Sequence, residues 1–150
     1  MARFRYRMQN ILDVKEKLET QAKNEFAIAN AKLLEEEKKL ESLRERKAGY
    51  EDKLRSLYDA GLDVVEINRT RDAIDNIKLR IEEQELNVKH AMKNVDIARE
   101  HLTEAMQERK THEKLKEKQF EQFLLDEAAK ESKEIDELVS FRHGQGQGED

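Results

Sequence analysis

Three histidines in the second half of the chain are the residues best suited to metal or proton chemistry. His90, His101 and His112 recur every eleven residues, which places them on one row of a helix. In a helix this spacing separates successive imidazoles by ~16 Å, too far for them to share one metal ion. The spacing therefore favours three solvated surface histidines over a metal site.

His112 and Glu113 also resemble the start of the zinc-protease motif, in which two histidines four residues apart hold the metal. The second ligand is missing, because position 116 is Lys116. The sequence has no cysteine, no glycine-rich phosphate-binding loop and no Ser/His/Asp grouping. We therefore expect no enzymatic activity, no metal, no cofactor and no small-molecule substrate.

The composition limits the class of protein and of partner. Charged residues make up 42% of the 150 residues and hydrophobic residues 37%, with a net charge of −5. Both signs of charge are interspersed, so there is no basic stripe of the kind that binds nucleic acid. No segment approaches the ~20 apolar residues of a membrane span, and no apolar signal-peptide core follows the basic residues 1–7. We expect no nucleic-acid partner and a location at most peripheral to a membrane.

The elements that must position these side chains are long helices. Six apolar residues recur at strict seven-residue spacing, and the chain contains no proline. Such a repeat predicts one long helix that holds the same seam against a partner helix. A disordered charged chain, the competing interpretation of this composition, shows no sustained period. The six residues are Ile67, Ile74, Ile81, Val88, Val95 and Leu102.

We expect an all-α fold, a long antiparallel coiled-coil hairpin with a C-terminal helical overhang. A first helix over residues 4–58 and a second over residues 64–141 are joined by a turn over residues 59–63, in which Gly61 ends one helix and Asp63 caps the next. Residues 1–143 form a single hairpin domain, and residues 144–150 a disordered tail. The apolar band of the first helix contains a local stutter at Leu18. This band comprises Met8, Ile11, Leu18, Ala22, Phe26, Ala29, Leu33, Leu40, Leu43, Tyr50, Leu54 and Leu57.

The two arms of the hairpin are complementary in size. Folding about Gly61 pairs residues whose numbers sum to about 124. Phe26 then faces Ala98, and Ala29 faces Val95, so large side chains meet small ones as an interdigitated seam requires. A parallel homodimer lacks this complementarity, because it would stack Phe26 on itself.

The second helix is predicted to extend beyond the end of the first. The first helix has no residues left to pair with the second beyond about position 120, which leaves roughly 30 Å of single helix past the paired region. An apolar stripe on an unpaired helix needs a partner from outside the chain. The stripe comprises Phe120, Phe123, Leu124, Leu125, Ile135, Leu138 and Phe141.

Three arginines alternate with two aromatic residues at the start of the chain: Arg3, Phe4, Arg5, Tyr6 and Arg7. Three cations at a helix N-terminus oppose the helix dipole. One interpretation is that they pair across the hairpin with Glu117 and Glu121. The other is that they contact an anionic partner surface or membrane headgroups. The residues themselves favour neither interpretation.

Five segments carry a family resemblance: FRYRMQNILDVKE at residues 4–16, QAK at 21–23, ERK at 108–110, EKLKEK at 113–118 and KEIDEL at 133–138. Together they resemble the bacterial flagellar export protein FliJ family. The Phe-x-Tyr-Arg-x-Gln opening is the least generic part. The resemblance covers nearly the whole chain except the glycine- and glutamine-rich tail.

The resemblance implies a two-helix coiled coil similar to the central stalk subunit of rotary ATPases, within the flagellar type III export apparatus. It implies a cytoplasmic location at the inner face of the cell membrane, in the flagellar basal body. The implied partners are a hexameric export ATPase, an export gate protein and export chaperones. A structural coiled-coil tether or a dimeric cytoskeletal coiled coil is the alternative. A stalk leaves the overhang free to enter a ring, whereas a tether pairs it with another copy.

The resemblance also implies two binding surfaces. Leu43, Tyr50 and Ile77 match positions that contact the export gate. The two ends of the hairpin arms are expected to enter the ATPase ring, as a stalk does. That surface comprises Arg3, Phe4, Arg5, Arg7, Met8, Phe120, Phe123 and Leu124.

Overall fold

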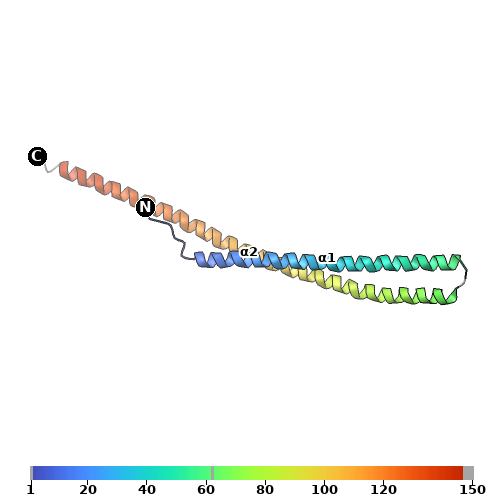
Figure 1. Ribbon diagram of the computed structural model, residues 1–150. Coiled ribbons are helices and arrows are strands. Elements are labelled where there is room, and N and C mark those ends of the chain that lie inside the picture. Colours follow the sequence, from blue (N-terminus) through green and yellow to red (C-terminus); the bar gives the residue numbers. More distant parts are fainter. Residues whose placement is uncertain (1, 62, 147–150) are drawn as a thin grey trace. The chain divides into compact units, whose positions relative to one another are not determined.

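Two long helices, α1 (Gln9–Asp59) and α2 (Val64–Gly146), make up nearly all of the computed structural model (Figure 1). The structure describes residues 2–61 and 63–146. Within these residues there is no strand, and the two helices pack against each other through a buried seam. The predicted all-α helical hairpin is confirmed. No helix in the described ranges is long and apolar enough to cross a membrane.

The helix bounds differ from the predicted ones at both ends of the chain. α1 begins at Gln9 rather than at residue 4, and the Gln9 amide donates to the Tyr6 carbonyl at 3.2 Å. Residues 2–6 are not helical, which keeps Arg3 and Arg5 out of the first turn of the helix, where cations oppose the helix dipole. α2 continues through Gly146 into the predicted tail, because no proline stops it and each added residue gains a backbone hydrogen bond. The rest of that tail, residues 147–150, lies outside the described residues.

The turn between the helices uses the residue types identified in the sequence. Gly61 has a φ of 105°, in the region that favours glycine. The Asp63 carboxylate caps α2 by accepting a hydrogen bond from the Glu66 amide at 3.3 Å. Glu66 also forms a 2.9 Å ion pair with Lys53 of α1. Leu62, which belongs to the predicted turn, lies outside the described residues.

The chain divides into two compact units, each containing a stretch of both helices. Unit 1 comprises Met1–Glu19 and Ala105–Asp150, and unit 2 comprises Thr20–Glu104. In unit 2, the predicted α2 stripe is buried at Ile67, Ile74, Ile81 and Val95 and half-buried at Val88. A second stripe, three residues later in each heptad, completes the seam as it does in coiled coils. It comprises Thr70, Ile77, Gln84, Ala91 and Ala98.

α1 carries an unbroken heptad repeat, so the predicted stutter is wrong. Leu18 is 43% exposed and Ile11 is 40% exposed, whereas the adjacent Leu12 and Glu19 are buried. The apolar spacing was misleading because Glu19 holds a seam position with a carboxylate, which pairs with Arg109 of α2. The stripe runs through Leu12, Glu19, Phe26, Leu33, Leu40, Lys47 and Leu54.

Cross-helix partners confirm the antiparallel register. Their residue numbers sum to between 119 and 129, around the predicted 124. The Arg99 guanidinium lies 5.7 Å from the centre of the Phe26 ring, next to the buried Ala98. The partners are Lys15–Glu108 and Glu19–Arg109 in unit 1, and Phe26–Arg99, Glu36–Gln84, Arg44–Glu85 and Lys53–Glu66 in unit 2.

Candidate interaction surfaces

An aromatic cluster in unit 1 joins the start of the chain to α2. The ring centre of Phe4 lies 5.1 Å from that of Phe120 and 5.5 Å from that of Phe123. Phe120 and Phe123 lie about one helical turn apart, with 6.5 Å between their ring centres. Tyr6, two residues after Phe4, is buried. The non-helical segment 2–6 is therefore held in place by aromatic side chains.

The prediction that Phe120 and Phe123 have no partner within the chain is wrong. That prediction considered only packing between helices, whereas the ring of Phe4 packs on both from a non-helical segment. The cluster is nevertheless accessible, because Phe120 remains 43% exposed and Leu124 50% exposed. Met8 is half-buried in the same unit.

The three arginines at the start of the chain are exposed beside this cluster. None of their guanidinium groups has a carboxylate oxygen within 4 Å in the described part of the chain, so the pairing with Glu117 and Glu121 is not formed. In a non-helical segment, neighbouring side chains can alternate between opposite sides, with the aromatic rings packed and the guanidinium groups in solvent. The three residues are Arg3, Arg5 and Arg7.

Farther from the aromatic cluster, the seam of unit 1 contains ion pairs. Arg109 of α2 donates from Nη1 to Glu113 at 2.8 Å and from Nε to the buried Glu19 of α1. Hydrogen bonds to Glu113 and Glu19 hold the pKa of the Arg109 guanidinium above its usual value. A second ion pair, Lys15–Glu108, spans the helices at 2.9 Å, and the Lys15 hydrogen bond lowers the pKa of the Glu108 carboxyl.

His112 lies in this seam, contrary to its predicted surface position. It is half-buried, and its Nδ1 is shielded from solvent with no hydrogen-bond partner among the described residues. His90 and His101 are exposed, as predicted. Residues eleven apart differ by four positions in a seven-residue repeat, so the three histidines occupy three different heptad positions. The position of His112 is one that faces the seam. Across residues 2–61 and 63–146, no three His, Cys, Asp or Glu side chains group so that they could hold a metal ion.

Unit 2 contains a buried polar pair that the apolar periodicity of the sequence does not reveal. The Gln84 amide donates to the Glu36 backbone carbonyl at 2.9 Å and to the Glu36 carboxylate. The Lys32 ammonium lies 3.1 Å from that carboxylate. The hydrogen bond from Gln84, followed by that from Lys32, holds the pKa of the Glu36 carboxyl below its usual range. The sequence does indicate that Gln84 faces the seam, because it lies three residues after Ile81, at the second seam position of the heptad repeat.

Two of the three residues expected to contact the gate share one hollow in unit 2. Tyr50 of α1 is half-buried, and Ile77 of α2 is buried. Both line a hollow of ≈ 170 Å³, together with the small side chain of Ala73. Leu43 lies elsewhere, in a hollow with Lys38, Ser42 and other residues. The lining of the first hollow is Arg46, Tyr50, Ala73, Asn76, Ile77 and Arg80.

Arg46 and Arg80 belong to neither of the two binding surfaces predicted from the sequence. A positional signal was available, because Arg46 precedes Tyr50 by four residues and Arg80 follows Ile77 by three. Residues three or four apart share a helix face, so each arginine accompanies an expected gate residue.

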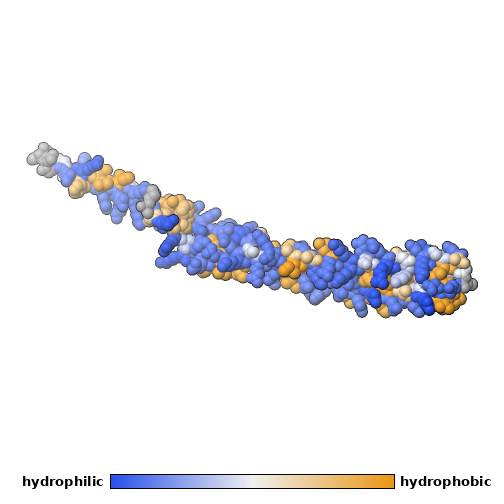
Figure 2. Space-filling model, in the orientation of Figure 1, coloured by the Kyte–Doolittle hydropathy of each residue, from blue (hydrophilic) through white to orange (hydrophobic). Residues whose placement is uncertain are grey.

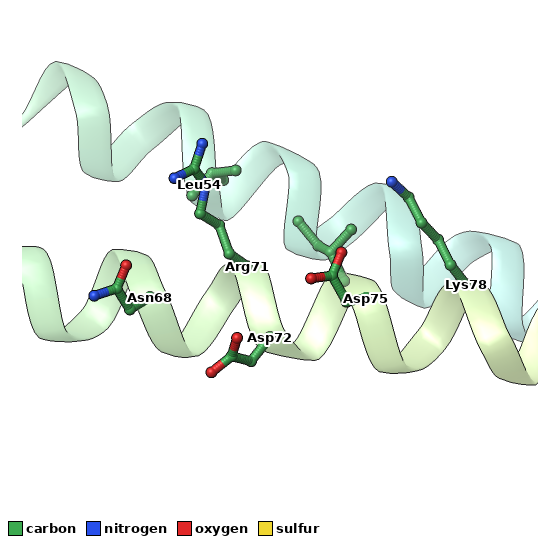
Figure 3. A pocket seen from close by; sticks show the side chains of 7 residues that line it. Leu54, Asn68, Arg71, Asp72, Asp75 and Lys78 are labelled. Atoms are coloured by element: carbon green, nitrogen blue, oxygen red, sulfur yellow. The ribbon is translucent and has the colours of Figure 1, made fainter.

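A larger hollow of ≈ 600 Å³ lies nearer the turn in unit 2, and its charges are balanced (Figure 3). Arg71 extends from α2 toward α1, where Leu54 lies, and Lys78 lines the same space. Two carboxylates, Asp72 and Asp75, accompany these two cations. The hollow therefore offers no net charge for selecting a partner.

The end of α2 presents apolar side chains to solvent. Every described residue from 128 to 146 is exposed. Figure 2 shows hydrophobic surface along this part of α2, between charged side chains. The exposed apolar residues include Ile135, Leu138, Val139 and Phe141.

Comparisons with known proteins agree with this architecture. A family model described as flagellar FliJ protein matches residues 4–148. The flagellar FliJ protein of Bacillus subtilis (strain 168) is 31% identical over 142 residues, which cover 90% of this chain and 92% of the relative. The solved structure of CT670 from Chlamydia trachomatis, described as a YscO homolog, aligns with a TM-score of 0.53. This alignment covers 99% of this chain and 100% of that chain at 23% identity, and it bears on the fold alone.

The family match begins at Phe4 and ends at residue 148, so it includes the aromatic opening and the seams of both units, and the relative covers 90% of the chain. The protein therefore belongs to the flagellar FliJ protein family and is a component of flagellar protein export.

Proposed function

We propose that this protein is a non-enzymatic stalk and adaptor of the flagellar type III export apparatus. In this role it links the hexameric export ATPase to the export gate at the cytoplasmic face of the cell membrane. It assists the export of flagellar subunits together with export chaperones. Family membership supports the role in export, and the two surfaces described above support separate contacts for the two main partners.

The aromatic cluster of unit 1 is the observation that carries the proposal. Phe120 and Leu124 leave apolar area accessible where the start of the chain meets α2. Burial of this area supplies the main favourable free energy of binding. The exposed Arg3, Arg5 and Arg7 add a salt-sensitive attraction to an acidic surface. We assign this surface, with Phe4, Met8 and Phe123, to the ATPase ring.

The hollow lined by Tyr50 and Ile77 in unit 2 is the surface that we assign to the export gate. Tyr50 and Ile77 lie together there, which supports their joint role in one contact. Leu43 lines a separate hollow of the same unit and would form an adjacent part of the interface. The two partners thus engage different units of the chain.

The ATPase contact is tested by replacing Phe120 and Phe123 with serine. We expect binding to the purified export ATPase to weaken by roughly tenfold or more, because apolar contact area is lost. Swimming in soft agar should fall in parallel. Circular dichroism should show nearly unchanged helix content, because in the described structure both rings pack on the non-helical Phe4. Leu79→Ser with Leu86→Ser, at positions 61% and 66% exposed in unit 2, is the matched control. If the Phe120/Phe123 variant binds and swims like the wild type, the assignment to the ATPase ring is wrong.

A structural tether is the second candidate, favoured by the exposed apolar residues near the end of α2. Ile135 and Leu138 lie on one side of this helix and would pair with a second copy in a tether. Analytical ultracentrifugation separates the two functions. A concentration-dependent dimer that Ile135→Ser and Leu138→Ser together abolish would favour the tether, and a monomer at all concentrations would favour the stalk.

A further inference from the structure

The hollow that contains Tyr50 and Ile77 carries uncompensated positive charge. Its lining includes two arginines, Arg46 and Arg80, one from each helix, and no acidic residue. The remaining lining residues, Ala73 and Asn76 among them, are uncharged. A concave surface of this kind selects an anionic group.

Both arginines are available to a partner. Arg46 and Arg80 are exposed, and neither guanidinium lies within 4 Å of a carboxylate oxygen of the described residues. This is notable in a chain with 34 acidic residues. Arg44, only two positions before Arg46, reaches Glu85 at 3.5 Å. The unpaired state therefore reflects the position of these two side chains rather than a shortage of carboxylates.

The other two described hollows differ in charge. The one nearer the turn combines Arg71 and Lys78 with two aspartates (Figure 3). In the one containing Leu43, the ammonium of Lys39 is paired with Glu35 at 3.3 Å. Positive charge without a carboxylate in the lining thus distinguishes the hollow of Arg46 and Arg80 from these two.

We propose that this hollow binds an acidic segment of a protein partner. An Asp or Glu carboxylate of the partner is held between Arg46 and Arg80, and a neighbouring apolar side chain rests on Ala73 beside Tyr50 and Ile77. Guanidinium groups bind carboxylates through paired, charge-assisted hydrogen bonds, and tyrosine at a pocket edge commonly anchors an interface. The hollow is small, which suits one side chain and its neighbour rather than a folded domain. The identity of the partner rests on the proposed gate contact.

The test measures binding of the full chain to the purified soluble domain of the export gate by isothermal titration calorimetry. Arg46→Gln with Arg80→Gln removes the attraction without adding repulsion and should weaken binding by about tenfold to a hundredfold. The wild-type affinity should fall with added salt, and that of the double variant should fall less. Arg69→Glu, at an exposed arginine of unit 2 that lines none of these hollows, is the matched control and should leave the affinity within about twofold.

Overlapping peptides of the gate domain identify the bound segment. We expect the peptides that bind the wild type to contain Asp or Glu next to an apolar residue, and to lose binding when the acids are replaced by their amides. Circular dichroism of each protein variant checks that the hairpin is intact.

Three outcomes would overturn the inference, and they are distinguishable. If Tyr50→Ala weakens gate binding but the double variant Arg46→Gln with Arg80→Gln does not, the gate contact stands and carboxylate recognition is wrong. If Arg69→Glu weakens binding as much as the double variant, the attraction is general and not specific to the hollow. If neither Tyr50→Ala nor the double variant Arg46→Gln with Arg80→Gln changes the affinity, the proposed gate contact at this hollow fails together with the inference.

Discussion

The ring of Phe4 packs edge-on against the ring of Phe120, with 5.1 Å between their centres and an interplanar angle of 66°. Such edge-to-face pairs are worth about 0.5–1.5 kcal/mol beyond the area that they bury. The contact fixes a non-helical segment onto α2 and covers part of the surface that we assign to the ATPase. A partner that binds Phe120 therefore meets Phe4 as well.

Phe4→Ala should release the start of the chain from α2. We expect faster amide hydrogen exchange over residues 2–8, because the aromatic anchor is lost, with little change in the rest of α1. Exchange measured by mass spectrometry on peptides covering these residues checks the effect. Arg5→Ala is the control, because Arg5 is exposed in the same segment. Equal exchange in the wild type and in Phe4→Ala would mean that the ring does not hold the segment.

Spin labels at Glu41→Cys and Glu83→Cys should report the hairpin directly. Both positions are exposed in unit 2, their numbers sum to 124, and the chain has no native cysteine. Packed helices lie ~8–10 Å apart, so double electron–electron resonance should give one short distance. Dilution with unlabelled protein should leave that distance unchanged. A distance that disappears on dilution would show pairing between molecules instead.

Ile81→Ala should destabilise unit 2 by about 2–4 kcal/mol, because it removes buried methyl groups and leaves a cavity. Val88→Ala should cost less, because Val88 is only half-buried. The measurement is the free energy of unfolding from urea titrations. Leu79→Ala provides the control at an exposed position and should stay within about 0.5 kcal/mol. A loss below about 0.5 kcal/mol for Ile81→Ala would contradict its place in the seam.

The Glu36 carboxyl should make stability depend on pH in the acid range. Hydrogen bonds from Gln84 and Lys32 lower its pKa in the folded protein, so the folded state binds this proton more weakly than the unfolded chain. The stabilisation is complete above the unfolded pKa of about 4.5 and is lost as the pH falls through the lower folded value.

Glu36→Gln should therefore flatten the fall in melting temperature below pH 4.5. Glu37→Gln, at the exposed neighbouring position, controls for the general loss of a carboxylate. Parallel acid profiles for the wild type and Glu36→Gln would show that this carboxyl does not titrate with folding.

The heptad at Ile67, Ile74 and Ile81 by itself determined that α2 is a long helix with one buried face. Gly61 and Asp63 determined where the chain reverses, because one tolerates a positive φ and the other caps a helix. The position of the turn then set the register, because an antiparallel pairing is defined by the sum of the paired residue numbers and the turn fixes that sum. These properties depend on local residue type and period, which a sequence states directly.

The polar seam positions were decided only by the tertiary structure. Glu19 and Gln84 are buried because Arg109 and Glu36 on the opposite helix satisfy them, and apolar periodicity cannot detect such partners. The start of the chain, where Phe4 packs on Phe120, departed from the helical expectation for a similar reason. Each of these positions depends on a pair of side chains 48 or more residues apart, so its conformation follows from the partner rather than from its own neighbours.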